Sequence, residues 1–167
     1  MKCAVDTGAL LSLACSAHFS FILEEHDLIT TEEVHDELLE FAAYNDFLGK
    51  QAQKILKYVD EKKITKEKPT VFLSLKIAAA ELSVFSLGKE KKYIILTDDL
   101  HAARVAEQQL RVFSRPSFFL FLHLYKSKKI TRQELLVDME TVVQQRKWMS
   151  GVLYKYVKEV LESLKQK

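Results

Sequence analysis

Carboxylates directly follow the two most strand-like segments of the sequence. Asp6 ends the apolar run at residues 2–5, and Asp98 and Asp99 follow the β-branched run at residues 93–96. A carboxylate next to a buried strand is costly to desolvate unless it is paired or binds a cation. In open parallel sheets, sites form beyond the carboxyl ends of the strands. These three acids are therefore the first candidates for a cation site.

Two more acids lie in segments whose periodicity predicts helices. Glu37 flanks the apolar stripe of a helix expected over about residues 31–44. Glu81 lies inside an Ala- and Leu-rich helix expected over residues 72–88, where its neighbours one turn away are apolar or small. An acid in such surroundings is not expected to face only solvent.

Oxygen ligands without a cysteine–histidine cluster indicate a hard cation, either Mg²⁺ or Mn²⁺. Such an ion accepts phosphate oxygens and lowers the pKa of a bound water, so hydrolysis of a phosphodiester bond is the chemistry that these residues favour.

Short strands that alternate with helices must position these acids, which predicts an α/β fold with a parallel sheet covered on both faces. Strands are expected at residues 2–5, 28–29, 93–96 and 112–113. Besides the two helices above, the pattern predicts helices over residues 9–23, 48–60, 100–109, 117–125, 133–145 and 148–164.

The 167 residues include only 4 glycines and 2 prolines, which argues against a β-rich fold and against disorder. No signal-peptide pattern or membrane-length apolar run is present, and Cys3 and Cys15 lie in apolar runs. We therefore expect a cytoplasmic protein that is not associated with a membrane. The net charge of +2 conceals a division, because residues 126–167 carry +5 and residues 1–125 carry −3.

The ordered set of motifs resembles the PIN-domain nucleases. The resemblance covers about residues 1–125 and rests on Asp6-Thr7, then Thr31-x-x-Val34-x-x-Glu37-Leu38, Ala80-Glu81-Leu82 and Leu96-Thr97-Asp98-Asp99-x-x-Ala102. The subgroup with an acid at the third motif carries glycine before it, where this chain has Ala80.

The resemblance implies a three-layer α/β/α fold with a parallel sheet of about five strands. It also implies a site that binds Mg²⁺ or Mn²⁺ and cleaves single-stranded RNA. The catalytic acids would be Asp6, Glu37, Glu81, Asp98 and Asp99. All of these except Glu37 would hold the metal, and Thr7 and Thr97 would support them. Spacing slightly favours Asp99 over Asp98 as the stronger ligand without excluding either.

We divide the chain into a nuclease domain at residues 1–125 and a helical extension at residues 126–167. The extension packs either on that domain or on a partner through apolar side chains that include Trp148, Tyr154 and Val157. Expected partners are single-stranded RNA, a second copy in a homodimer and, for a toxin of this family, an antitoxin protein. The basic residues Arg104, Lys126, Lys128 and Lys129 are candidates for holding RNA phosphates.

Three other interpretations fit the sequence less well. The Asp-Thr-Gly at residues 6–8 matches the aspartic-protease signature, but that class needs a β-rich fold. A phosphorylated receiver domain needs an acidic pair after the first strand, and here Asp6 stands alone. Five histidines show no second pair at zinc-ligand spacing. A catalytically silent RNA- or protein-binding module stays open as the alternative to a nuclease.

Overall fold

The fold is seen in a computed structural model that describes residues 1–147 and 151–163. Its elements are, in chain order, β1 (Lys2–Val5), α1 (Thr7–Ala14), α2 (Phe19–Glu25), β2 (Asp27–Thr30), α3 (Glu32–Ala42), α4 (Phe47–Asp60), β3 (Ile64–Lys66), α5 (Ala79–Lys91), β4 (Ile94–Leu96), α6 (Leu100–Leu110), β5 (Ser114–Arg115), α7 (Phe118–Lys126), α8 (Arg132–Gln145) and α9 (Gly151–Ser163).

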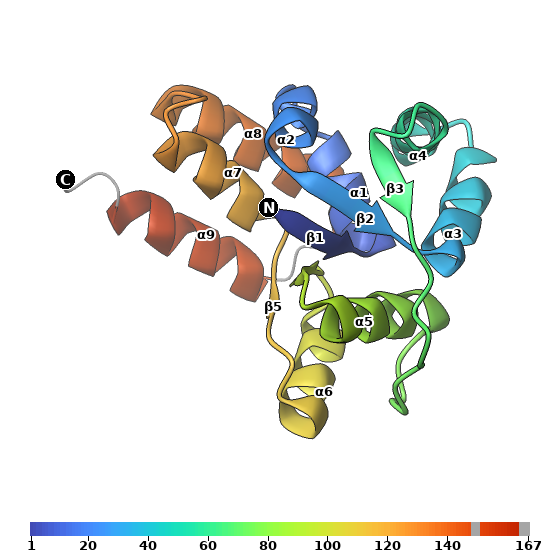
Figure 1. Ribbon diagram of the computed structural model, residues 1–167. Helices are drawn as coiled ribbons and strands as arrows, with labels where there is room; N and C mark the ends of the chain where they lie inside the picture. Colours follow the sequence, from blue (N-terminus) through green and yellow to red (C-terminus); the bar gives the residue numbers. More distant parts are fainter. Residues whose placement is uncertain (148–150, 164–167) are drawn as a thin grey trace.

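The strands form one parallel sheet in the order β3-β2-β1-β4-β5. Figure 1 shows helices on both sides of this sheet, with α5 and α6 on one side and α1, α2, α7 and α8 on the other. The expected α/β/α architecture with about five parallel strands is therefore confirmed. Because β1 is central, and Ala4 pairs with both Ile29 and Ile95, its carboxyl end lies between those of β2 and β4.

The predicted helix over residues 9–23 is wrong, because the chain forms two helices, α1 and α2, bent by 120°. Contacts that local periodicity does not show hold the turn between them. The hydroxyl of Ser16 accepts a hydrogen bond from the backbone N–H of His18 at 2.8 Å, and Asp138 of α8 accepts one from that of Ala17 at 3.3 Å.

No single helix within residues 1–147 and 151–163 is long and apolar enough to cross a membrane, although α1 and α2 pass that test of length and composition as a bent pair.

The helix predicted over residues 72–88 begins later, at Ala79, and ends later, at Lys91. The residues before it run alongside α5 and use its side chains as hydrogen-bond partners. Ser86 accepts a hydrogen bond from the backbone N–H of Leu73 at 2.9 Å, and a carboxylate further along α5 does the same for Thr70. These tertiary contacts outweigh the helix propensity of the segment.

Gly88 was expected to end this helix and instead lies inside it. A Cβ atom at Gly88 would come within 2.2 Å of Ile95 Cγ1, so the missing side chain lets α5 pack closely on β4. The C-cap of the helix is Lys92, which has a left-handed backbone with φ of 58°.

Two strands differ from expectation. β3 was not predicted because it has three residues, of which only Ile64 is buried. The last strand comes two residues later than predicted, at Ser114–Arg115, where Leu96 pairs with Arg115.

Helices α7 and α8 pack against each other and add Phe121, Leu135 and Val142 to the hydrophobic core. The beginning of α8 carries a capping box between Thr131 and Glu134. On α9, Val157 is buried in the same core. Trp148, which was predicted to take part in this packing, lies outside the described residues.

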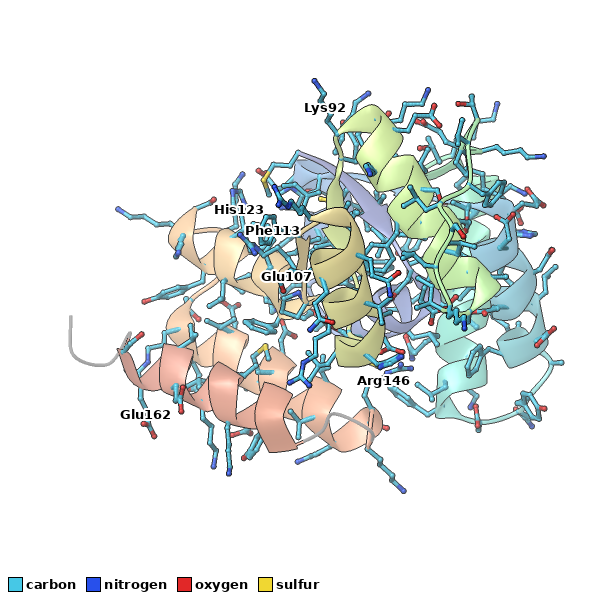
Figure 2. The ribbon with its side chains drawn as sticks, turned by 90° about the horizontal axis from the view of Figure 1, so that it is seen from below. Lys92, Glu107, Phe113, His123, Arg146 and Glu162 are labelled. Carbon is cyan, nitrogen blue, oxygen red and sulfur yellow. The ribbon has the colours of Figure 1, made fainter. Side chains whose placement is uncertain are left out.

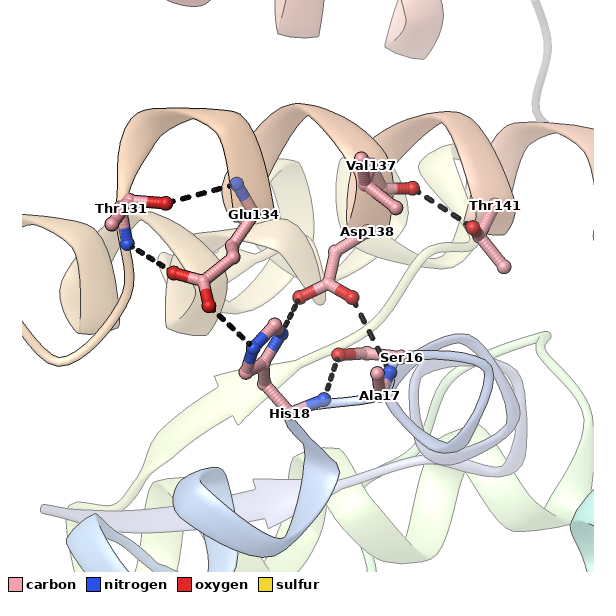
Figure 3. A network of polar contacts seen from close by, with 8 residues as sticks. All are labelled: Ser16, Ala17, His18, Thr131, Glu134, Val137, Asp138 and Thr141. Carbon is pink, nitrogen blue, oxygen red and sulfur yellow. Dashed lines mark hydrogen bonds and ion pairs between the residues drawn. The ribbon is translucent and has the colours of Figure 1, made fainter.

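A polar network ties α8 to the turn between α1 and α2 (Figure 3). The buried carboxylate of Asp138 lies 2.7 Å from Nδ1 of His18 and accepts the hydrogen bond from Ala17 described above. Glu134 approaches the other ring nitrogen at 3.6 Å. Helix α8 is therefore joined to the N-terminal part by a buried polar contact as well as by apolar packing.

Candidate metal-binding active site

Asp6 lies at the carboxyl end of the central strand and is buried. Its backbone N–H donates to the carbonyl of Leu96, which continues the pairing between β1 and β4. Its Oδ1 accepts a hydrogen bond from the backbone N–H of Ala9 at 2.6 Å, so Asp6 is also the N-cap of α1. Strand and helix together fix the direction of this carboxylate.

Asp98 follows the neighbouring strand β4 and is also buried. Its Oδ1 accepts a hydrogen bond from the backbone N–H of Ser117 at 2.7 Å. Thr97, just before it, is buried, and its hydroxyl lies near enough to Asp6 to act on that carboxylate and lower its pKa. The predicted supporting residue thus joins the ends of β1 and β4.

Asp99 is exposed and caps α6. Its Oδ1 accepts hydrogen bonds from the backbone N–H groups of His101 at 2.7 Å and Ala102 at 3.0 Å. The two neighbouring aspartates therefore differ in environment, because Asp98 is buried and held by a distant segment, whereas Asp99 is held by its own helix.

Glu37 is half-buried and reaches the site from α3. It accepts a hydrogen bond of 2.5 Å from the hydroxyl of Thr7, the residue after Asp6. The predicted pair of an acid and a supporting hydroxyl is thus in direct contact across 30 positions of sequence.

Glu81 lies in the first turn of α5 and is half-buried. A buried hydrogen bond of 2.6 Å between Thr31 and Ser83 joins the start of α3 to α5, the two helices that carry Glu37 and Glu81. Packing of these helices therefore brings the two glutamates to the same end of the sheet.

The five predicted acids influence one another electrostatically. Burial raises the pKa of Asp6 to about 7, and the negative charges of Asp98 and Glu81 add to this shift. Burial also raises the pKa of Glu81, to which the charges of Glu37 and Asp99 contribute. Hydrogen bonds from Thr97 and Ala9 act in the opposite direction on Asp6, although the net shift is upward. Such clustered and perturbed carboxylates are typical of functional sites.

Two oxygen atoms of this cluster fit a bound cation. Oδ2 of Asp98 and Oε2 of Glu81 are shielded from solvent and have no hydrogen-bond partner among the described residues. A buried carboxylate oxygen without a partner is costly, and a cation is the group that would satisfy it. Since all of the donors are oxygens, the residues present fit Mg²⁺ or Mn²⁺.

A second acidic group lies elsewhere, on the outer surface of α3. Among the described residues, the ligand atoms of Glu32, His35 and Asp36 lie within 4.8 Å of one another. Glu32 is already paired with Lys66 at 3.0 Å. Among the described residues, no three of the predicted acids bring their ligand oxygens this close together, so the oxygens of the predicted site are more widely spaced.

The predicted RNA-binding residues divide between the two ends of the molecule. Arg104 is exposed on α6, the helix capped by Asp99, and so belongs to the end with the acids. Helix α7 begins there, beside Asp98, and runs away from it. The residues at its far end, Lys126, Lys128 and Lys129, line a separate hollow of about 480 Å³.

An ion pair confirms the remote position of these lysines. Lys129 lies 2.8 Å from Glu25, which is at the end of α2 just before β2 begins. The lysines therefore lie at the amino ends of the strands, and the structure does not bring them to the predicted acids.

The structure adds a basic residue that was not predicted. Arg146, directly after α8, is buried, and its charge interacts with those of Asp98 and Asp6. No local motif marks it, because it is 140 positions from Asp6. The one signal in the sequence is its place on the apolar stripe of α8, after Leu135, Met139 and Val142.

Comparison with known proteins agrees with this geometry. No curated protein matches the chain. A family model described as a PIN domain matches residues 2–165, which is nearly the whole chain and includes both C-terminal helices. With this match, and with its parallel sheet and helices on both sides, the chain belongs to the PIN-domain family, whose fold is of the nuclease type.

Proposed function

We propose that this protein is a divalent-metal-dependent endoribonuclease that hydrolyses phosphodiester bonds in single-stranded RNA. The observation that carries the proposal is a pair of buried oxygens, on Asp98 and Glu81, that have no hydrogen-bond partner among the described residues and lie within a cluster of five acids at the carboxyl ends of β1 and β4. Sites of parallel α/β folds occur at this edge.

The residues that would hold Mg²⁺ or Mn²⁺ are Asp6, Glu81, Asp98 and Asp99, either directly or through water. The metal would supply Lewis acidity and a water of lowered pKa.

The protein residues have separate tasks in this proposal. Helices α1 and α6 fix Asp6 and Asp99 through their caps, and Ser117 fixes Asp98. Glu37, held by Thr7, orients the attacking water. The exposed Arg104 attracts the RNA backbone to this end of the molecule by its charge.

Cleavage of a labelled single-stranded RNA in Mg²⁺ or Mn²⁺ tests the proposal. Asp6→Asn is expected to lower the rate by about 100-fold or more, because it removes a charge that the metal needs. Asp46→Asn is the matched control, since Asp46 caps α4 as Asp6 caps α1 but lies outside the site. Equal cleavage by wild type and Asp6→Asn would sink the assignment, and duplex RNA and single-stranded DNA are the comparison substrates.

Calorimetric titration with Mn²⁺ distinguishes the nuclease from the silent binding module. A nuclease of this type is expected to bind Mn²⁺ with an affinity that depends on Asp6 and Asp98. A protein that neither cleaves RNA nor binds Mn²⁺ through these carboxylates would be the binding module instead.

We further propose that this nuclease is a toxin that an antitoxin partner holds inactive. A toxin role predicts growth arrest on expression of the wild-type chain and none with Asp6→Asn. A homodimer and a cytoplasmic location belong to the same proposal, and sedimentation of the purified chain measures the first of these.

A further inference from the structure

Helix α8 ends by placing a guanidinium in the protein interior. Its buried face consists of Leu135, Asp138, Met139 and Val142, and Arg146 continues that face with 5% of its surface exposed. A buried charge is costly unless charges of opposite sign lie nearby. Among the described residues, the carboxylates of Asp98 and Asp6 are charges of opposite sign that act on Arg146.

Gly8 locates the guanidinium relative to Asp6. The point where a Cβ of Gly8 would lie is 3.5 Å from Oδ1 of Asp6 and 3.8 Å from Nη2 of Arg146. The two groups therefore approach the same small space above the first turn of α1. In Figure 2, Arg146 lies toward the end of α6 that begins after Asp99. Burial lowers the pKa of Arg146, whereas the charges of Asp98 and Asp6 raise it.

The helix that carries Arg146 is anchored two turns earlier. Asp138 is buried and contacts His18 and Ala17 in the turn that follows α1, as Figure 3 shows. Helix α1 begins at the site, with Asp6 as its cap. One helix thus connects the anchor of α8 to the carboxylate that its guanidinium approaches, so the position of Arg146 is built into the fold.

We propose that Arg146 is a resident counter-cation that competes with the divalent metal for the charge of Asp6 and Asp98, so that helix α8 sets the metal affinity of the site. This inference rests on the proposed function for the identity of the metal. Arg146 is a positioning residue here, since it acts through the carboxylates rather than on RNA.

Competition of this kind has two consequences of opposite sign. Without metal, Arg146 balances part of the carboxylate charge and stabilises the fold. With metal, its positive charge repels the incoming cation and weakens binding. A residue that served packing alone would not stabilise the apo protein and weaken metal binding at the same time.

The test compares Arg146→Met with wild type by calorimetric Mn²⁺ titration and by thermal unfolding in EDTA, both at pH 8.5. Arg146→Met is expected to unfold several degrees lower in EDTA and to bind Mn²⁺ about tenfold more tightly, as removal of a nearby like charge predicts. Arg146→Lys keeps the charge and is expected to bind Mn²⁺ with nearly wild-type affinity. Lys147→Met is the matched control, because Lys147 is adjacent but exposed.

Unchanged or weaker Mn²⁺ binding by Arg146→Met would overturn the inference. If that variant does not fold, Arg146→Gln carries the same expectation, because it removes the charge and keeps a polar side chain. RNA cleavage separates the two proposals. Tighter Mn²⁺ binding without any cleavage by the wild type removes the nuclease and leaves the counter-cation, whereas cleavage with unchanged Mn²⁺ affinity does the reverse.

Discussion

At the scale of single residues, Asp6 is a buried carboxylate among other acids, and its negative charge costs folding free energy. Its pKa of about 7 lies above the ordinary value of 3.8. A raised pKa means that the folded state holds a proton that the unfolded state has released. The contribution of Asp6 to stability is therefore fully present below about pH 4 and is lost as the pH rises through 7.

Asp6→Asn is expected to stabilise the metal-free protein by about 2 to 4 kcal/mol at pH 8, since asparagine carries no charge and caps a helix as well as aspartate does. Urea unfolding in EDTA at pH 5 and pH 8 measures this effect, and the difference between the two proteins should be larger at pH 8. If Asp6→Asn were less stable than wild type at pH 8, the explanation that the buried negative charge of Asp6 destabilises the fold would be wrong.

The comparison must be made as a difference because a histidine opposes the trend. Burial lowers the pKa of His26 to about 4, and the ring lies against that of His123 with centroids 4.8 Å apart. The unfolded state binds more protons between pH 4 and 6.5, so His26 makes both proteins less stable on acidification. This contribution cancels when Asp6→Asn is subtracted from wild type.

Local sequence predicted some residues of the candidate site and missed others. The motifs identified Asp6, Thr97, Asp98 and Asp99, because each lies beside a strand end that the apolar pattern predicts. Arg146 was missed, since its relation to Asp6 depends on how α8 packs and on no nearby residue. Lys126, Lys128 and Lys129 were predicted to hold RNA phosphates from their charge alone, and the structure places them at the end of the molecule opposite the acids.

At the scale of elements, periodicity located most helices and failed where tertiary contacts decide. The break between α1 and α2 depends on Asp138, more than 120 positions away from Ala17, and no glycine or proline marks it. The late start of α5 depends on hydrogen bonds that Ser86 and Glu90 accept from backbone N–H groups of the preceding segment. β3 is too short and too exposed for its sequence to show a strand.

Because glycine is scarce, basic residues take the left-handed backbone conformation at several helix ends. Lys62, Lys92, Arg111 and Lys128 adopt the left-handed backbone at or near helix ends, where glycine is commonest. A side chain in this conformation costs free energy that glycine avoids.

Lys92→Gly is therefore expected to stabilise the protein by about 0.5 to 1 kcal/mol, the gain being limited by the greater freedom of glycine in the unfolded chain. Lys89→Gly, three positions earlier and inside α5, should destabilise it by about 1 kcal/mol. Chemical unfolding of both variants gives the comparison, and equal effects of the two would refute this explanation.

At the scale of the whole molecule, the C-terminal helices belong to the core as much as the sheet does. Helix α8 packs on α7, contacts the turn after α1 through Asp138 and sends Arg146 toward the acids. The family match also extends to residue 165. The predicted division at residue 125 separates parts that the structure joins by buried contacts.

A fragment of residues 1–130 is therefore expected to lack a cooperative unfolding transition, because it loses the buried face of α8 and exposes the face of α7 beneath it. A fragment of residues 1–147 keeps α8 and should still unfold cooperatively. Urea titration followed by circular dichroism distinguishes the two. Cooperative unfolding of the shorter fragment would establish residues 126–167 as an appendage.

The three aspartates of the site share one arrangement of their oxygens. In each of Asp6, Asp98 and Asp99, Oδ1 accepts a backbone N–H, from Ala9, from Ser117 or from the first turn of α6. One oxygen of each of these three aspartates is thus bonded to the backbone, and chelation of an ion by both oxygens of one aspartate is disfavoured. Large cations such as Ca²⁺ use bidentate carboxylates and six to eight ligands, whereas Mg²⁺ takes single oxygens in a rigid octahedron. We therefore expect the backbone hydrogen bonds that hold these side chains to bias the proposed metal site toward small ions.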